Sequence, residues 1–105
     1  MLQKVIRDGY VAVLVSPGFG AGWYTWHGIE ELLFDPIVVE MVETGKHFSL
    51  IQEYCENAYR DREGYYYGAS DLIVDWVREG DEFIVVEYDG NESLVFKEDM
   101  EWITA

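Results

Sequence analysis

The chain has 105 residues, which is the size of one ordinary domain and not of two. Half of the residues are apolar and 16% are aromatic, too many for a disordered acidic tail, so we expect a single folded domain over residues 1–105. The formal net charge of −14 excludes the basic surface by which proteins bind nucleic acid, and anionic membranes would repel such a chain.

The first predicted element is a β-strand over residues 10–15, because this run is apolar and rich in β-branched side chains. Its uninterrupted apolar character predicts burial on both faces. Pro17 lacks a backbone donor and ends the pairing.

A first helix is predicted from Asp35 onward. Asp35 is placed to cap it, Pro36 suits the first helical position, and Gly45 stands where the helix would end. Its buried stripe is predicted to consist of Ile37, Val38, Met41 and Val42.

A second helix is predicted to begin at Ser49, which forms a capping box with Gln52, and to run to about Tyr59. Residues 60–64 then form a polar loop. Cys55 falls on the apolar side of this helix, where we expect it to be buried. A lone cysteine cannot form an intrachain disulfide, which fits a reducing cytosol.

The last third changes to strand periodicity, with turn residues between the strands. Together with the first strand and the two helices, these strands predict an α+β fold: a mainly antiparallel sheet, made of an N-terminal strand and a C-terminal meander, packed by two helices. The predicted strands are 72–77, 83–87 and 93–97, with turns at 80–81 and 89–91 and a short edge segment at Trp102–Ile103.

The segment between the first strand and the first helix combines alternating glycines with aromatic side chains. Successive backbone N–H groups of such a loop can bind an anion, hydroxyls add donors, and aromatic faces can stack on a nucleobase. The alternative interpretation is a tight turn whose tryptophans fill the core. The candidate ligand contacts of this segment are Ser16, Gly18, Gly20, Gly22, Trp23, Tyr24, Thr25 and Trp26.

A second candidate contact set lies in the polar loop and the tyrosine run that follows it. Arg60 and Arg62 offer guanidinium groups beside Tyr66, a combination suited to a phosphorylated aromatic ligand. Lys46 and Arg7 are weaker candidates. The alternative is that the tyrosines are simply amphipathic and half-buried.

The acidic residues are concentrated toward the end of the chain. Residues 71–105 contain eleven Asp and Glu against Arg78 and Lys97. Such a surface could mimic the DNA backbone and occupy the basic groove of a host enzyme, or it could simply keep the domain soluble.

Catalytic motifs are weak throughout. His27 and His47 lie twenty residues apart without a cysteine or carboxylate at metal-ligand spacing, and Ser16 precedes a proline and lacks a nucleophile elbow. We therefore expect a protein that is not an enzyme and has no metal or cofactor.

Three blocks of the sequence resemble a group of small acidic proteins that is widespread in bacteriophage genomes. The first block, residues 13–26, reads VLVSPGFGAGWYTW, and its alternation of glycine and tryptophan is the most specific. The others are residues 67–77 and 83–93. This group is identified as the phage anti-defence sponge family, which acts against cyclic-oligonucleotide immune signalling.

The resemblance implies a protein in the cytoplasm of the infected host that binds cyclic dinucleotides such as cyclic GMP-AMP without cleaving them. It also implies a homo-oligomer, a tetramer, that holds the ligand at subunit interfaces. Two other functions stay open: an acidic inhibitor that binds a host nucleic-acid enzyme, and a structural component of the virion.

Overall fold

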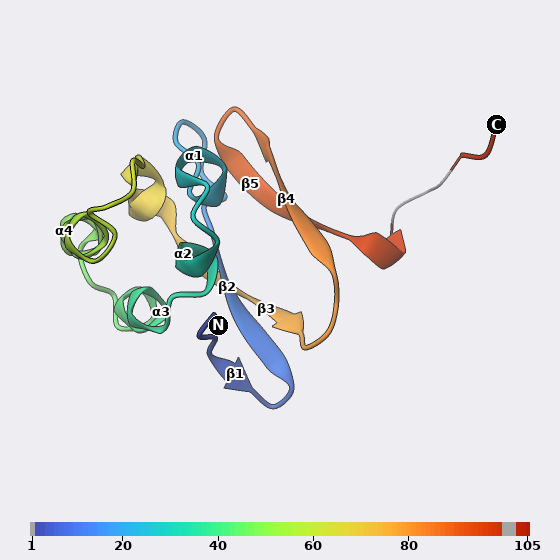
Figure 1. Ribbon diagram of the computed structural model, residues 1–105, viewed down its shortest axis with the longest axis horizontal. Helices are drawn as coiled ribbons and strands as arrows, with labels where there is room; N and C mark the ends of the chain where they lie inside the picture. The colour runs from blue at the N-terminus through green and yellow to red at the C-terminus, as the bar shows by residue number, and fades with distance from the viewer. Residues whose placement is uncertain (1, 100–102) are drawn as a thin grey trace.

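The computed structural model describes residues 2–99 and 103–105 (Figure 1). Within them the fold class is α+β, as predicted, with helices and two antiparallel sheets. The strands are β1 (Ile6–Arg7), β2 (Tyr10–Val15), β3 (Ile73–Arg78), β4 (Phe83–Tyr88) and β5 (Asn91–Phe96). The helices are α1 (Tyr24–His27), α2 (Glu30–Phe34), α3 (Pro36–Glu43) and α4 (Phe48–Ala58), with 3-10 segments η1 (Tyr67–Asp71) and η2 (Lys97–Asp99).

Strand β2 lies at the centre of the three-stranded sheet β1-β2-β3 and is covered on both faces, as predicted. Ala12 and Leu14 belong to the core cluster that the helices complete. Val11, Val13 and Val15 belong to a second cluster, against which residues of β4 and β5 pack. The sheet is therefore the middle layer between the helices and the β4–β5 hairpin, an order that can be followed across Figure 1.

The C-terminal strands succeed one another in antiparallel fashion but divide between two sheets. β3 pairs with β2 along its whole length, from Tyr10 opposite Arg78 to Val15 opposite Ile73. β4 and β5 pair with each other through a two-residue turn, predicted at this place, in which Gly90 has a φ of 85°. This division follows from β2, because a strand that is apolar on both faces needs a cover on each side.

Helix α3 begins as predicted, since the Asp35 side chain accepts hydrogen bonds from Ile37 N and Val38 N. Gly45 follows its end in the left-handed region, with a φ of 69°. The predicted buried stripe is partly wrong, because Ile37 is 51% exposed while Val38 and Val39 are buried. The stripe is therefore rotated by one position toward Val39.

Helix α4 begins one residue earlier than predicted, and the capping box is wrong. His47 is the N-cap, and its Nδ1 atom accepts from Ser49 N over 3.2 Å. Ser49 lies inside the helix and so cannot cap it. Gln52 instead donates through Nε2 to Tyr66 O over 3.3 Å, which ties α4 to the segment that follows the polar loop. Cys55 is fully buried, as expected.

The short helices α1 and α2 were not predicted. Most of α1 was interpreted as part of a glycine-aromatic loop, and no element was predicted over the residues of α2. Gly28, with a φ of 66°, ends α1 and donates from its N–H to Tyr24 O over 2.7 Å. α2 then buries Leu32, Leu33 and Phe34 between the two core clusters. No helix in the described part of the chain has the length and apolar character needed to cross a membrane.

Only one residue of the predicted C-terminal edge segment lies within the described part of the chain. Trp102 lies outside the described residues, and Ile103 is 97% exposed and forms no strand.

Candidate functional site

The glycine loop, which we define as residues 16–22, folds against the buried carboxylate of Glu92. Ser16 N donates to Glu92 Oε1 over 3.0 Å. Thr25 N and Thr25 Oγ1 donate to Glu92 Oε2 over 2.9 and 2.7 Å. Hydrogen bonds to an ionised carboxylate are stronger than neutral ones. Donors that were predicted to bind an external anion are thus occupied by a carboxylate of the same chain.

Sequence reasoning missed Glu92, although the strand pattern contained a signal for it. Glu92 alternates with Leu94 and Phe96, which places its side chain on the face of β5 that packs against the core. A carboxylate on that face is 2% exposed and must have polar partners. The structure supplies those partners from Ser16 and Thr25.

Two glycines of other segments are required by close contacts with the glycine loop. A Cβ atom at Gly68 would collide with the carbonyl of Gly22, and one at Gly90 would collide with the backbone of Gly20. Gly20 N also donates to Asp89 O over 2.8 Å. The loop is therefore a packed junction between η1 and the β4–β5 turn.

Ser16 and Trp23 are corrected as ligand contacts, because both side chains are fully buried. Ser16 Oγ donates to Ala21 O, and Trp23 Nε1 donates to Leu32 O over 3.3 Å. Trp23 fills the core beneath the glycine loop and has no face free to stack on a base. This outcome matches the alternative interpretation given for this part of the segment.

The remaining candidates of the segment divide between two places. Tyr24 is half-buried and lines a groove beside β4, whereas Trp26 is 41% exposed and faces the polar loop. Gly18, Gly20, Gly22 and Thr25 stay in the junction around Glu92 and do not line the cleft near the arginines.

Trp26 lines one surface cleft of about 650 Å³ together with Arg60, Arg62 and Tyr66, which lie far from it in the sequence. We call it the arginine cleft. Trp26 comes from α1, and the other three come from the connection between α4 and η1. The sequence left open whether the arginines approach the aromatic segment, and in the structure Arg60 and Arg62 line the same cleft as Trp26.

Exposed Trp26 and Tyr65 line the arginine cleft, and exposed Tyr67 contacts both of them beside it. Tyr65 and Tyr67 are 63% and 60% exposed, and their rings stack with centroids 6.1 Å apart and planes at 18°. The Trp26 ring meets Tyr67 edge-on at 6.5 Å. Three large aromatic side chains therefore present faces to solvent, an arrangement that can stack planar ligands.

The two arginines differ in their engagement. Arg62 donates through Nη2 to Glu31 Oε2 over 2.6 Å, whereas Arg60 forms no ion pair with the described residues. Glu56 and Glu63 also line the cleft, so its formal charge is balanced. Arg60 is consequently the guanidinium most available to an added anion.

A buried hydrogen-bond network fixes the loop that carries the arginines. The Asp35 carboxylate, which caps α3, also accepts from Tyr54 OH over 2.9 Å and from Tyr59 OH over 2.6 Å. Burial, followed by the bond to Asp35, raises the pKa of both tyrosines well above the usual value, so both remain donors. Tyr59 O in turn accepts from Arg62 N over 2.9 Å.

His27 and Tyr66 form an aromatic cluster with Trp23 next to the cleft, with ring centroids 4.8 to 6.1 Å apart. Burial lowers the pKa of His27 to about 4, so the ring is neutral at pH 7. Its Nδ1 accepts from Ile29 N over 2.8 Å, which leaves the proton on Nε2. Neither that atom nor Tyr66 OH has a hydrogen-bond partner among the described residues.

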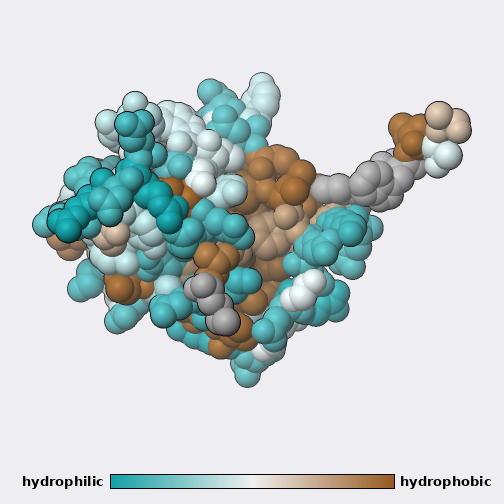
Figure 2. Space-filling model, in the orientation of Figure 1, coloured by the Kyte–Doolittle hydropathy of each residue, from teal (hydrophilic) through white to brown (hydrophobic). Residues whose placement is uncertain are grey.

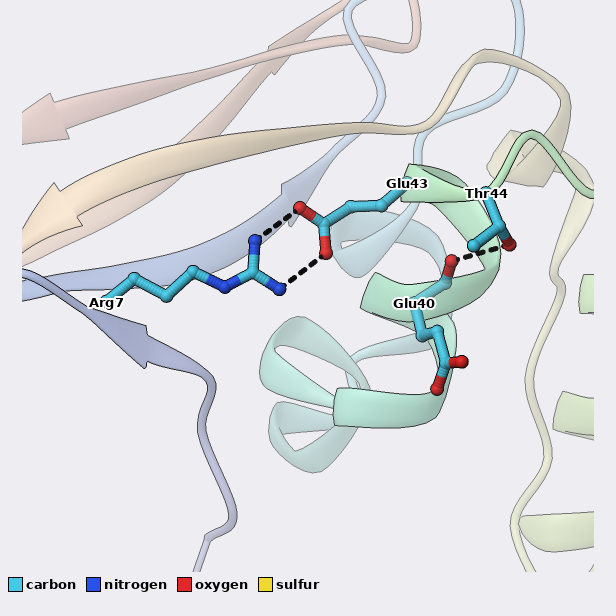
Figure 3. Close-up of polar contacts among 4 residues, drawn as sticks. All are labelled: Arg7, Glu40, Glu43 and Thr44. Atoms are coloured by element: carbon cyan, nitrogen blue, oxygen red, sulfur yellow. Dashed lines mark hydrogen bonds and ion pairs between the residues drawn. The ribbon is translucent and has the colours of Figure 1, made fainter.

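The weaker cationic candidates lie elsewhere. Arg7 makes a bidentate pair with Glu43 over 2.7 and 2.9 Å at the end of α3, where Thr44 Oγ1 also donates to Glu40 O (Figure 3). This pair raises the pKa of Arg7 and lowers that of Glu43 through their hydrogen bonds. Neither Arg7 nor Lys46 lines the arginine cleft.

Neither a reactive thiol nor a metal site is found among the described residues. Burial raises the pKa of the Cys55 thiol to about 12, so it is protonated at neutral pH. Within residues 2–99 and 103–105, no three His, Cys, Asp or Glu side chains are grouped so that they could hold a metal ion. The arginine cleft itself offers stacking faces and guanidinium donors.

Comparisons with protein families, with curated proteins and with solved structures found no match.

Proposed function

We propose that this protein binds a cyclic dinucleotide immune signal, such as cyclic GMP-AMP, in the arginine cleft and sequesters it without cleavage. The observation that supports the proposal is the meeting of Trp26 with Arg60, Arg62 and the exposed Tyr65 in one cleft of about 650 Å³. A cyclic dinucleotide has planar bases and two phosphates, and the cleft offers faces for the former and guanidinium groups for the latter. The resemblance to phage anti-defence proteins suggested the same ligand class.

The net charge of −14 opposes an anionic ligand, so the local charge must decide. At physiological ionic strength exposed charges are screened beyond about 8 Å, which leaves the nearest groups dominant. Arg60 meets a phosphate directly. Arg62 contributes if the phosphate replaces the carboxylate of Glu31.

The proposal includes a homotetramer in the cytoplasm of a phage-infected host, with the ligand at subunit interfaces. The exposed rim of Tyr65 and Tyr67 supports this part, because a second subunit could cover those rings and the outer face of a bound ligand.

The test is retention of ligand by the purified protein. Protein is mixed with a panel of cyclic dinucleotides, unbound ligand is removed by filtration, and the denatured protein is analysed by mass spectrometry. We expect intact cyclic dinucleotide in stoichiometric amount, and loss of about tenfold or more in affinity for Trp26→Ala.

The control is Phe19→Ala, which removes an exposed aromatic side chain of the glycine loop that does not line the cleft. Its retention of ligand should equal that of the parent. Recovery of a cleaved product would make the protein an enzyme, and ligand left entirely in the filtrate would contradict sequestration and favour the acidic inhibitor.

A further inference from the structure

Strand β4 has a free edge that lies beside a groove. Lys97 N donates to Glu82 O, so Glu82 and Lys97 form a hydrogen-bonded pair. This pair directly precedes the pair of Phe83 with Phe96 in the ladder. Hydrogen-bonded and non-hydrogen-bonded pairs alternate along antiparallel strands. The backbone groups of Phe83 and Val85 therefore point away from β5, and they have no hydrogen-bond partner among the described residues.

The opposite edge of the hairpin confirms this alternation. Glu92 N points away from β4 and donates to Ser16 O over 2.8 Å at the end of β2. β5 is thus partly joined to the central sheet, while β4 is open beside Phe83 and Val85. An open edge of this kind is a template for an added strand.

The groove next to this edge has a volume of about 510 Å³ and lies between α2 and β4. Leu33 and Phe34 of α2 line one side, and Phe83 and Val85 line the other. Apolar side chains gather over β4 in the middle of the face shown in Figure 2. A strand added to β4 would place every second side chain in this groove, because alternate residues share a face.

The negative charge around the groove favours a ligand with basic side chains. Glu30, Asp81 and Glu82 line it, and no Lys or Arg does. Asp81 and Glu82 pair with Arg78 and Lys97, but these pairs are exposed and can exchange partners. A second copy of this chain is disfavoured at this edge, because two β4 edges side by side would bring together the carboxylates that line each groove.

We propose that the β4 edge and the α2–β4 groove bind an extended peptide segment of a partner protein, in which apolar and basic side chains alternate. The segment adds to β4 as an antiparallel strand, its apolar side chains fill the groove, and its basic side chains meet the surrounding carboxylates. This site is separate from the arginine cleft and does not depend on the function proposed for it.

The experiment uses a fluorescein-labelled peptide of about eight residues in which valine and lysine alternate, a length that matches the six-residue β4 with one residue on each side. Binding to the full chain is measured by fluorescence anisotropy. Valines that face the groove lie opposite Phe83 and Val85, so their N–H groups point at β4, whereas lysine N–H groups point away.

Backbone methylation therefore gives a matched pair of probes. We expect N-methylation of the valines to weaken binding by about tenfold or more, and N-methylation of the lysines to leave it within about twofold. The same peptide with glutamate in place of lysine should not bind. Equal binding of the two methylated peptides would overturn the proposal, since strand addition requires the difference.

A protein variant tests the same edge from the other side. Val85→Pro removes an N–H that makes no ladder bond, so the hairpin should survive while peptide affinity falls by about tenfold. Sedimentation of the protein alone provides the last check. Self-association that Val85→Pro abolishes would assign the groove to a second copy and overturn the peptide proposal.

Discussion

The junction around Glu92 and the arginine cleft both include residues of α1 but satisfy their polar groups in opposite ways. At the junction, Ser16 of the glycine loop and Thr25 of α1 donate to the buried carboxylate of Glu92. In the arginine cleft, Arg60 has no ion-pair partner among the described residues, and Trp26 is 41% exposed. The comparison teaches that a glycine-rich loop with many donors is not a ligand site when the chain supplies its own acceptor.

The largest expected effect is the loss of stability when the buried Trp23 beneath the glycine loop is replaced. Trp23→Ala should lower the free energy of unfolding by about 3–5 kcal/mol, because it leaves a cavity in the core. Trp26→Ala, three residues away on the exposed side, should cost about 1 kcal/mol or less. Urea unfolding followed by circular dichroism measures both, and equal losses would show that the two tryptophans are not segregated as described.

His27 makes stability depend on pH. Its pKa is about 4 in the folded state and 6.5 when unfolded, so the unfolded chain binds a proton first as the pH falls. The free energy of unfolding therefore keeps its full value above pH 6.5. It decreases as the pH falls toward 4, by about 3 kcal/mol at the acid end.

The matched variant is His27→Gln, compared with the parent at each pH. The stability difference between the two proteins should narrow as the pH falls from 7 to 4, since only the parent must keep a histidine uncharged. A pH-independent difference would mean that His27 is not desolvated in the folded protein.

Glu92→Gln tests the junction itself. The variant keeps the shape but turns one charged acceptor into an amide that cannot accept from both Ser16 and Thr25. We expect a loss of about 2 kcal/mol in the free energy of unfolding. Glu79→Gln, at an exposed carboxylate without a side-chain hydrogen bond among the described residues, is the control and should change stability by less than about 0.5 kcal/mol.

The smallest expected effects are changes in ligand affinity caused by substitutions in and beside the arginine cleft. Arg60→Ala should weaken cyclic dinucleotide binding by about tenfold, whereas Arg62→Ala should weaken it by about two- to threefold, because Arg62 must first leave Glu31. Glu31→Gln frees Arg62 and should strengthen binding in an isothermal titration. The reverse order of the two arginine variants would place the phosphate on the paired guanidinium.

The sequence correctly predicted the elements that depend on neighbouring residues of the chain. The β2 strand follows from its β-branched run, the start of α3 from Asp35 and Pro36, and the β4–β5 turn from Asp89 and Gly90. Each depends on side chains within a few residues, which is the range that sequence patterns describe well.

The remainder depends on contacts between distant segments. Glu92 reaches residues 16 and 25, and the predicted Ser49 cap was displaced because the His47 side chain takes that role. Of the predicted site, Trp26, Arg60, Arg62 and Tyr66 line one cleft. The sequence shows that Trp23 and Trp26 are aromatic but cannot show which of them faces the core, since that depends on how α1 packs.

The most direct measurement is fluorine NMR of the protein labelled with 5-fluorotryptophan, titrated with a cyclic dinucleotide. Each of the four tryptophans gives a resonance, which single Trp→Phe variants assign. The account predicts a saturable shift of the Trp26 resonance while that of the buried Trp23 stays in place. A shift at Trp23 with none at Trp26, or no shift at all, would contradict the assignment of the ligand to the arginine cleft.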